Sequence, residues 1–230
     1  QVRLPCRVVS VGNLTIGGHV NLSGTTVYLN GSADGSAGLN NTNTGYLFVR
    51  GNASNITAGE TTTFGYFFWN DAGSNLSLQD TSIFYSGYSG TRYGRCLTIN
   101  TTAVNISRVH IYDSGYVGLT ILEGANGTNY TATDISRASD ATVQIRYAKA
   151  LNISQHNSTK SSGGPSLIMD GLTLEHANLS GNSGDGIGGN VVRNLTLIDV
   201  NLTGGDQSGL GIINMNRSVF VGLNVTNNAV

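Results

Sequence analysis

Apolar and polar residues alternate with a period of two in short runs along the chain. The alternation is clear in "NLTI" from Asn13, "HVNL" from His19, "VNISRVHI" from Val104 and "TVQI" from Thr142. Such alternation is typical of strands that bury one side. No sustained i, i+3, i+4 apolar pattern is present, and β-branched residues, glycine and asparagine dominate. The pattern therefore predicts an all-β protein.

A longer period is superimposed on this alternation. Apolar runs begin just after a small residue at Gly18, Gly45, Gly65, Gly94, Gly118, Ala141, Gly164, Gly186 and Gly209. The last five starts are separated by 23, 23, 22 and 23 residues, whereas the first four are spaced more loosely. A fixed interval of this kind indicates a stacked repeat.

A parallel β-helix fits this repeat best. A leucine-rich repeat needs a dense leucine consensus, and a propeller blade needs a repeat of about 40 residues. In a β-helix each strand pairs with its equivalent one coil further on, apolar side chains point inward, and glycine and asparagine serve the corners. We expect about ten coils of roughly 23–24 residues in one domain, residues 1–230. Irregular coils with larger loops are expected in 1–93 and regular coils in 94–230, with Leu119, Val143, Ile187 and Leu210 buried.

Two segments carry a resemblance to a known group of proteins. "NLTIGGHVNLSGTTVYLNGSADG" and "VNISRVHIYDSGYVGLTIL" resemble right-handed parallel β-helix proteins, closest in style to Asn-rich archaeal cell-surface proteins. Those share the coil of pectate lyases and periplasmic copper-maturation proteins. The resemblance implies a right-handed β-helix, and because its motif is structural it favours a fold rather than a function.

Composition limits the partners. Only 11% of residues are charged and the formal net charge is −1, so we expect no nucleic-acid partner and no attraction to anionic lipid. No run reaches the 18 or so apolar residues of a membrane helix. No signal peptide is visible, although Gln1 is compatible with an end left by signal cleavage.

The polar surface must be built from 26 Asn and 47 Ser and Thr residues. Random placement of these residues gives about 5 Asn-X-Ser/Thr triplets by the arithmetic of composition. The chain has 18, at Asn13, Asn21, Asn30, Asn40, Asn52, Asn55, Asn75, Asn100, Asn105, Asn126, Asn129, Asn152, Asn157, Asn178, Asn194, Asn201, Asn216 and Asn224.

Two interpretations of the triplets exclude each other at any one residue. The first is N-glycosylation, which requires an exported chain and supplies covalent N-linked glycans as the only attached group we expect, without other cofactors. The second is a ladder of stacked amides, each bonded to the next coil. Asn178, Asn201 and Asn224 would stack about 4.8 Å apart, which crowds neighbouring sugars. We expect more room at Asn30, Asn40, Asn126 and Asn157, taken as loop positions.

Candidate chemistry is sparse. Counting from the nearest coil start, the best pair is His176 and Asp199, which we interpret as an exposed ion pair of small energetic value. "SGDGIGG" around Asp185 occurs once and predicts a corner rather than a calcium site. The histidines His19, His110 and His156 share no phase, so no metal site is expected. The sequence thus predicts a protein that is not an enzyme.

Aromatic residues cluster in "FGYFFWN" from Phe64 and in "IFYSGYSGTRYGR" from Ile83. Alternation buries about half of them, which leaves two interpretations. Tyr85, Tyr88 and Tyr93 are candidate interface aromatics beside Arg92 and Arg95, or they belong to a bulkier early core with ordinary surface tyrosines.

The two cysteines, Cys6 and Cys96, lie three or four coils apart. That places their Cα atoms about 15 Å from each other, beyond the reach of a disulfide. We therefore expect two buried thiols.

The function predicted from these patterns is a non-catalytic, exported, N-glycosylated structural protein of the extracellular cell surface. It would be a subunit of a filament, sheath or surface layer, with copies of itself, head to tail or lateral, and surface carbohydrate as partners. The alternative is a carbohydrate-binding or polysaccharide-cleaving β-helix protein that uses an exposed aromatic face. The apolar "QVRLPCRVV" and the uncapped "NVTNNAV" predict either a longer rod or, preferably, polymer contacts at the ends.

Overall fold

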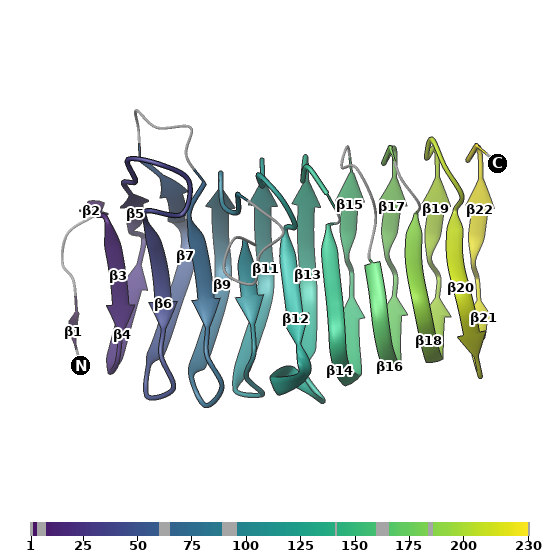
Figure 1. The fold of residues 1–230 in the computed structure, drawn as a ribbon, viewed down its shortest axis with the longest axis horizontal. Coiled ribbons are helices and arrows are strands. Elements are labelled where there is room, and N and C mark those ends of the chain that lie inside the picture. Colours follow the sequence, from purple (N-terminus) through teal and green to yellow (C-terminus); the bar gives the residue numbers. More distant parts are fainter. Residues whose placement is uncertain are drawn as a thin grey trace.

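The chain forms a parallel β-solenoid in a computed structural model (Figure 1). The structure describes residues 2–3, 8–59, 65–88, 96–140, 142–159, 166–183 and 186–229. The coils stack side by side along one axis, from β1 near the N-terminus to β22 near the C-terminus. All described strand pairs between coils are parallel and belong to one sheet.

The first half of the solenoid contains the strands β1 (Val2–Arg3), β2 (Val8–Val11), β3 (Asn13–Ile16), β4 (His19–Ser23), β5 (Thr26–Leu29), β6 (Gly38–Asn41), β7 (Tyr46–Ala58), β8 (Phe67–Asn70), β9 (Asn75–Phe84), β10 (Leu97–Ile99) and β11 (Val104–Tyr112). The second half contains β12 (Leu119–Leu122), the 3-10 turn η1 (Glu123–Ala125), β13 (Asn129–Ser136), β14 (Val143–Ser154), β15 (Asn157–Thr159), β16 (Ser166–Glu175), β17 (Asn178–Ser180), β18 (Ile187–Ile198), β19 (Asn201–Thr203), β20 (Leu210–Asn216), β21 (Val219–Val221) and β22 (Asn224–Thr226).

Each coil contributes strand segments to three columns, numbered in the order in which the chain visits them. The first column contains β3, β6, β8, β10, β12, the early parts of β14, β16 and β18, and β20. The second contains β1, β4, the early parts of β7, β9, β11 and β13, the late parts of β14, β16 and β18, and β21. The third column holds the site. Within the described residues it stacks ten segments in register: β2, β5, the later parts of β7, β9, β11 and β13, and then β15, β17, β19 and β22. Paired residues in this column are 29 positions apart at Asn55 and Thr26, 24 at His110 and Asp134, and 21 to 23 in later coils. The interval between paired residues therefore shortens along the stack, while the division into irregular and regular coils at 93/94 lies outside the described residues and stays a prediction.

A single residue turns the chain from the second column into the third. These corner residues have φ between 50° and 65°, a left-handed conformation, in coil after coil: Asp80, Arg108, Ala132, Gln155, His176, Asp199 and Gly222. Only the last is a glycine, so the others accept a cost of about 1 kcal/mol each for the left-handed backbone. A corner of constant length keeps the residues on either side of it in phase between coils.

The core fills the inside of the solenoid with the apolar side chains of all three columns. Several polar groups inside are hydrogen-bonded, as a water-excluded interior favours, while a few buried side-chain oxygens and nitrogens have no partner among the described residues. Asn41 donates to Oδ1 of Asn70 at 3.2 Å, and Asn70 donates to the Thr98 carbonyl at 3.1 Å. The Tyr66 hydroxyl donates to the Ile56 carbonyl at 3.0 Å.

Several predicted coil starts and buried residues agree with the structure. Gly118, Gly186 and Gly209 directly precede β12, β18 and β20, so these coil starts are confirmed. Leu119, Val143 and Ile187 are buried as expected. The predicted burial of Leu210 is wrong, because it is only half-buried on a coil that has a neighbouring coil on one side.

One predicted coil start is out of register. Leu119 pairs with Val143, and its amide donates to the Thr142 carbonyl at 2.9 Å. Thr142, rather than Ala141, is therefore the equivalent of Gly118, a shift of one residue.

Cys96 is a buried free thiol next to the Ser86 hydroxyl, and burial raises its pKa to about 12. Cys6 lies outside the described residues, so the predicted separation of the two cysteines stays a prediction. Within the described ranges no helix is long and apolar enough to cross a membrane.

His156 is a buried histidine in the third column, with its side chain 1% exposed. Its Nδ1 lies 2.7 Å from the Thr133 hydroxyl, and its Nε2 has no hydrogen-bond partner in the described part of the chain. Burial lowers the pKa of His156 from 6.5 to about 4. The folded state therefore holds this imidazole neutral.

Acidification should weaken the fold through His156. Below about pH 6.5 the unfolded chain takes up a proton that the folded chain refuses until about pH 4, so stability falls across that window by up to about 3 kcal/mol. Urea unfolding at pH 7, 5.5 and 4 should show a smaller fall for His156→Gln than for the wild type. The exposed-histidine control His19→Gln should follow the wild type; an unchanged fall in His156→Gln would contradict the assignment.

Candidate functional site

The outward side chains of the third column form a surface that we call the ladder face. It has two parallel rows, because residues two apart in a strand point to the same side. The first row is Thr26, Asn55, Ser82, His110, Asp134, Asn157, Asn178, Asn201 and Asn224. The second row contains Tyr28, Thr57, Phe84, Tyr112, Ser136, Ser180, Thr203 and Thr226.

The C-terminal part of the first row is a continuous chain of amide hydrogen bonds. The Nδ2 of Asn224 donates to Oδ1 of Asn201 at 2.9 Å, Asn201 donates to Asn178 at 3.1 Å, and Asn178 donates to Asn157 at 3.3 Å. Asn157 then donates to Oδ1 of Asp134 at 3.1 Å. Every bond runs in the same direction, and the chain ends on a carboxylate that can only accept.

His110 approaches the same carboxylate from the other side. Its Nδ1 lies 3.3 Å from Oδ2 of Asp134 on the next coil. The side chain of His110 is 44% exposed and that of Asp134 is 28% exposed. Nε2 of His110 has no hydrogen-bond partner among the described residues, so the imidazole is oriented by Asp134 at one nitrogen and open at the other.

Aromatic rings lie beside this pair. The rings of Phe84 and Tyr112 are stacked with centroids 5.3 Å apart, and His110 and Tyr112 are nearly parallel at 5.9 Å and 4°. The ring of Tyr85 also belongs to this group, with its centroid 6.4 Å from that of Phe84. Partial burial, followed by the charge of Asp134, raises the pKa of Tyr112, so its hydroxyl stays protonated at neutral pH.

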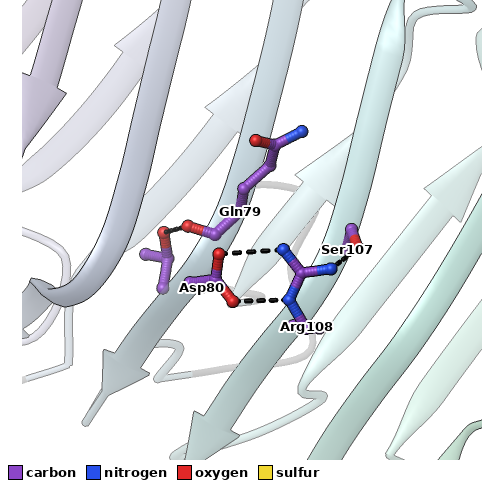
Figure 2. Close-up of polar contacts among 5 residues, drawn as sticks. Gln79, Asp80, Ser107 and Arg108 are labelled. Carbon is purple, nitrogen blue, oxygen red and sulfur yellow. Dashed lines mark hydrogen bonds and ion pairs between the residues drawn. The ribbon is translucent and has the colours of Figure 1, made fainter.

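Two arginine–aspartate pairs flank the aromatic rings at the corners of the coils. Figure 2 shows the guanidinium of Arg108 facing the carboxylate of Asp80 on the preceding coil, at 2.5 and 2.9 Å, with a further bond to Ser107. At the opposite corner Arg137 meets Asp113 in the same way, at 2.5 and 2.6 Å. The bond from Arg108 lowers the pKa of Asp80.

Together these groups occupy only three consecutive coils, those of β9, β11 and β13. We call them the aromatic–histidine cluster: Phe84, Tyr85, Tyr112, His110 and Asp134, with the flanking pairs Asp80–Arg108 and Asp113–Arg137. Flat rings beside hydrogen-bonding groups suit a ligand with apolar C–H faces and hydroxyl edges. An imidazole held by a carboxylate is also suited to proton transfer. No group of His, Cys, Asp and Glu in the described ranges could hold a metal ion.

The sequence-predicted site residues are distributed as follows. His176 and Asp199 lie side by side as predicted, with Nδ1 3.3 Å from Oδ2 and both side chains 58% exposed. Tyr85 is 52% exposed and joins the cluster. Tyr88 is half-buried and packs over Gly35, where an added Cβ would collide with its ring. Tyr93, Arg92, Arg95 and Asp185 lie outside the described residues.

The pairing of His110 with Asp134 was not predicted, and the reason is the coil start at Ala141. His110 lies eight residues before Gly118, and Asp134 lies seven before Ala141, so the two seemed out of phase. Counted from Thr142, they share a phase. The sequence does contain this pairing, because the strand segments "VHIY" and "TDIS" align residue by residue.

The structure also separates the glycosylation candidates. Asn178, Asn201 and Asn224 stack as predicted, and they are joined by hydrogen bonds. The placement of Asn40 and Asn157 on loops is wrong, because they belong to β6 and β15. The side chain of Asn52 lies outside the described residues.

Comparison with known proteins shows no family. No protein-family model and no curated protein matches the chain. Among solved structures, the periplasmic alginate epimerase AlgG is similar, with 13% identity, 90% of this chain and 77% of that chain covered, and a TM-score of 0.49. Two variants of AlgG match at 12% identity. For the first, the match covers 90% of this chain and 77% of the variant, with a TM-score of 0.46. For the second, it covers 93% of this chain and 79% of the variant, with a TM-score of 0.42.

The fold and the ladder face define a parallel β-helix protein with an exposed row of polar and aromatic side chains. The archaeal cell-surface style suggested by the sequence finds no support in these matches. The prediction that the protein is not an enzyme is contradicted, because each of the three matching structures is that of a polysaccharide-modifying enzyme. At this low identity the likeness concerns the fold and assigns no activity.

Proposed function

We propose that the protein binds a linear carbohydrate on the ladder face, with the aromatic–histidine cluster as the central contact. The observation that carries the proposal is the stack of Phe84, Tyr112 and His110 at the surface of three adjacent coils. Sugar rings present C–H faces that pack on aromatic rings and hydroxyls that bond to carboxylates and amides. This agrees with the alternative function predicted from the sequence and not with its preferred structural role.

The flanking ion pairs favour a role in ligand binding over a role in stabilising the fold. The Arg108 and Arg137 side chains are 59% and 56% exposed, and exposed pairs contribute little to folding. Their planar groups are held in fixed positions by two bonds each, so they present oriented donors at both edges of the rings. Orientation before binding reduces the entropy lost when a ligand docks.

Replacing Tyr112 by alanine should weaken carbohydrate binding about tenfold, which corresponds to about 1.4 kcal/mol. Tyr112→Phe keeps the ring and should bind within about threefold of the wild type, a difference below 1 kcal/mol. The matched control is Tyr147→Ala, since Tyr147 is 62% exposed on β14, away from the ladder face. Isothermal titration against a polysaccharide found by array screening would measure this; equal losses in both alanine variants would contradict the proposal.

A second candidate function is chemical modification of the bound carbohydrate. The specific observation is that Asp134 fixes His110 at Nδ1 while Nε2 is open beside the aromatic rings. Nε2 could take a proton from a water that attacks the anomeric carbon, and Asp134 would stabilise the imidazolium that forms. The glycosidic C–O bond breaks, its oxygen takes up a proton, and a new reducing end is left. We assign His110 as the candidate base and Asp134 as its positioning residue.

His110→Ala should lower product formation about 10²- to 10⁴-fold while leaving polysaccharide binding within about threefold, below 1 kcal/mol. The matched control is His176→Ala, because His176 is also an exposed histidine 3.3 Å from an aspartate, but outside the cluster. Product would be followed by NMR of the sugar protons and by newly formed reducing ends. An active His110→Ala variant, or a wild type that binds without converting any polysaccharide, would exclude this role.

We further propose that the protein is exported and carries N-linked glycans away from the ladder face. Asn126 is exposed at a corner, and its Oδ1 accepts the Lys149 amide at 2.7 Å, which leaves Nδ2 open. Asn75 is exposed at the start of β9 beside Tyr46, without an asparagine on the paired position. The ladder asparagines instead donate their Nδ2 groups and lie one coil apart, about 4.8 Å.

Mass spectrometry of native material should therefore find glycans at Asn75 and Asn126 and unmodified peptides containing Asn178, Asn201 and Asn224. Glycans on two neighbouring ladder residues of the same molecule would contradict the proposal, because the spacing leaves no room for both. A fully unmodified native chain would remove the glycosylation proposal altogether.

Self-association into a filament, sheath or surface layer, and location at the cell surface, remain predictions from the sequence. Sedimentation of the purified chain and labelling of intact cells would test them independently of carbohydrate binding.

A further inference from the structure

The ladder face beyond the cluster has unused hydrogen-bonding capacity. Each amide from Asn157 to Asn201 uses one Nδ2 hydrogen and one Oδ1 lone pair in the ladder. An amide has two hydrogens and two lone pairs, so each rung keeps one donor and one acceptor. The second row adds the hydroxyls of Ser180, Thr203 and Thr226 alongside.

This surface is fixed before any ligand arrives. The bonds between coils hold the amide planes, and the strand register repeats them about every 4.8 Å along the stack. From Asn157 to Asn224 the row extends over three steps, about 14 Å, and it continues from the cluster through the bond between Asn157 and Asp134. A ligand that docks on these rungs loses little protein side-chain entropy.

The charges on the face are balanced. Among the residues that the structure describes, the charged groups of the third column and its corners are mostly paired: Arg108 with Asp80, Arg137 with Asp113, His110 with Asp134 and His176 with Asp199. The outward side chains of the ladder from Asn157 to Thr226 are uncharged. A polyanion would find no unpaired cation on this described surface, whereas hydroxyl groups match the spare donors and acceptors.

We infer that the ladder from Asn157 to Asn224, with its hydroxyl row, is an extended binding surface for an uncharged linear polysaccharide lying along the stack of coils. The chain runs from the aromatic rings of the cluster onto the amide rungs. This inference rests on the proposed function and adds the substrate class and the direction in which the substrate lies.

The substrate class is tested with a panel of polysaccharides applied to the unglycosylated recombinant chain. Neutral linear glucan, mannan, xylan and galactan are compared with alginate, polygalacturonate and glucuronan by titration at low and physiological salt. Tighter binding of a neutral polymer than of every uronate is expected. If a uronate binds best, the inference fails while carbohydrate binding stands; if none of the polymers binds, the proposed function fails as well.

The direction is tested by ligand length. In Asn178→Ala/Asn201→Ala the affinity for the long polymer should fall about tenfold, while that for a trisaccharide, held by the cluster alone, should stay within twofold. The control Asn105→Ala/Asn129→Ala removes two exposed asparagines of neighbouring coils in the second column and should leave both affinities unchanged. Equal effects on polymer and trisaccharide, or no effect on either, would overturn the inference.

A second variant protects this test from a folding defect. Thr203→Val/Thr226→Val keeps β-branched side chains in the strands and removes only the outward hydroxyls. It should retain the wild-type unfolding midpoint and still weaken polymer binding several-fold. Unchanged polymer binding in this variant and in the asparagine variant would reject the ladder as a binding surface.

Discussion

The structure depends on one constraint: each strand pairs in parallel with its equivalent one coil further on. This pairing turns a position in the repeat into a column of side chains about 4.8 Å apart. Inward columns become the apolar core, with Ile111 stacked on Ile135. Outward columns become rows in which side chains of neighbouring coils contact one another. Like amides then form hydrogen bonds along the row, and opposite charges form ion pairs. The asparagine ladder and the arginine–aspartate pairs are both products of this stacking.

The one-residue corner before the third column explains why the ladder face is the most regular surface. Since every coil turns there with a single left-handed residue, from Asp80 to Gly222, no insertion disturbs the phase. Coil length varies elsewhere: the interval between paired residues falls from 28 at Asp80 and Arg108 to 21 at Asn157 and Asn178. The early coils can therefore carry longer loops without displacing His110 from Asp134.

The sequence predicted the repeat well because core periodicity and small corner residues are local signals. It predicted the pair His176–Asp199 for the same reason, since both lie ten residues before true coil starts. The pairing of His110 with Asp134 was not predicted because the coil start at Ala141 was wrong by one residue. The pairing of Asp80 with Arg108 was not predicted because the two coils that contain them differ in length. A phase measured from the tight corner would have found both. The stacking of Phe84 and Tyr112 also depends on register, which composition and alternation do not supply.

The position of the aromatic–histidine cluster follows from the direction of the ladder. Because each asparagine donates toward the N-terminus, the row ends on an acceptor, and Asp134 accepts there without having amide hydrogens of its own. Its second oxygen then remains available to the preceding coil, where His110 occupies it. The site thus lies at the junction between a repetitive amide surface and an aromatic one. Asp134 belongs to both halves, so it couples the geometry of the ladder to the orientation of the imidazole.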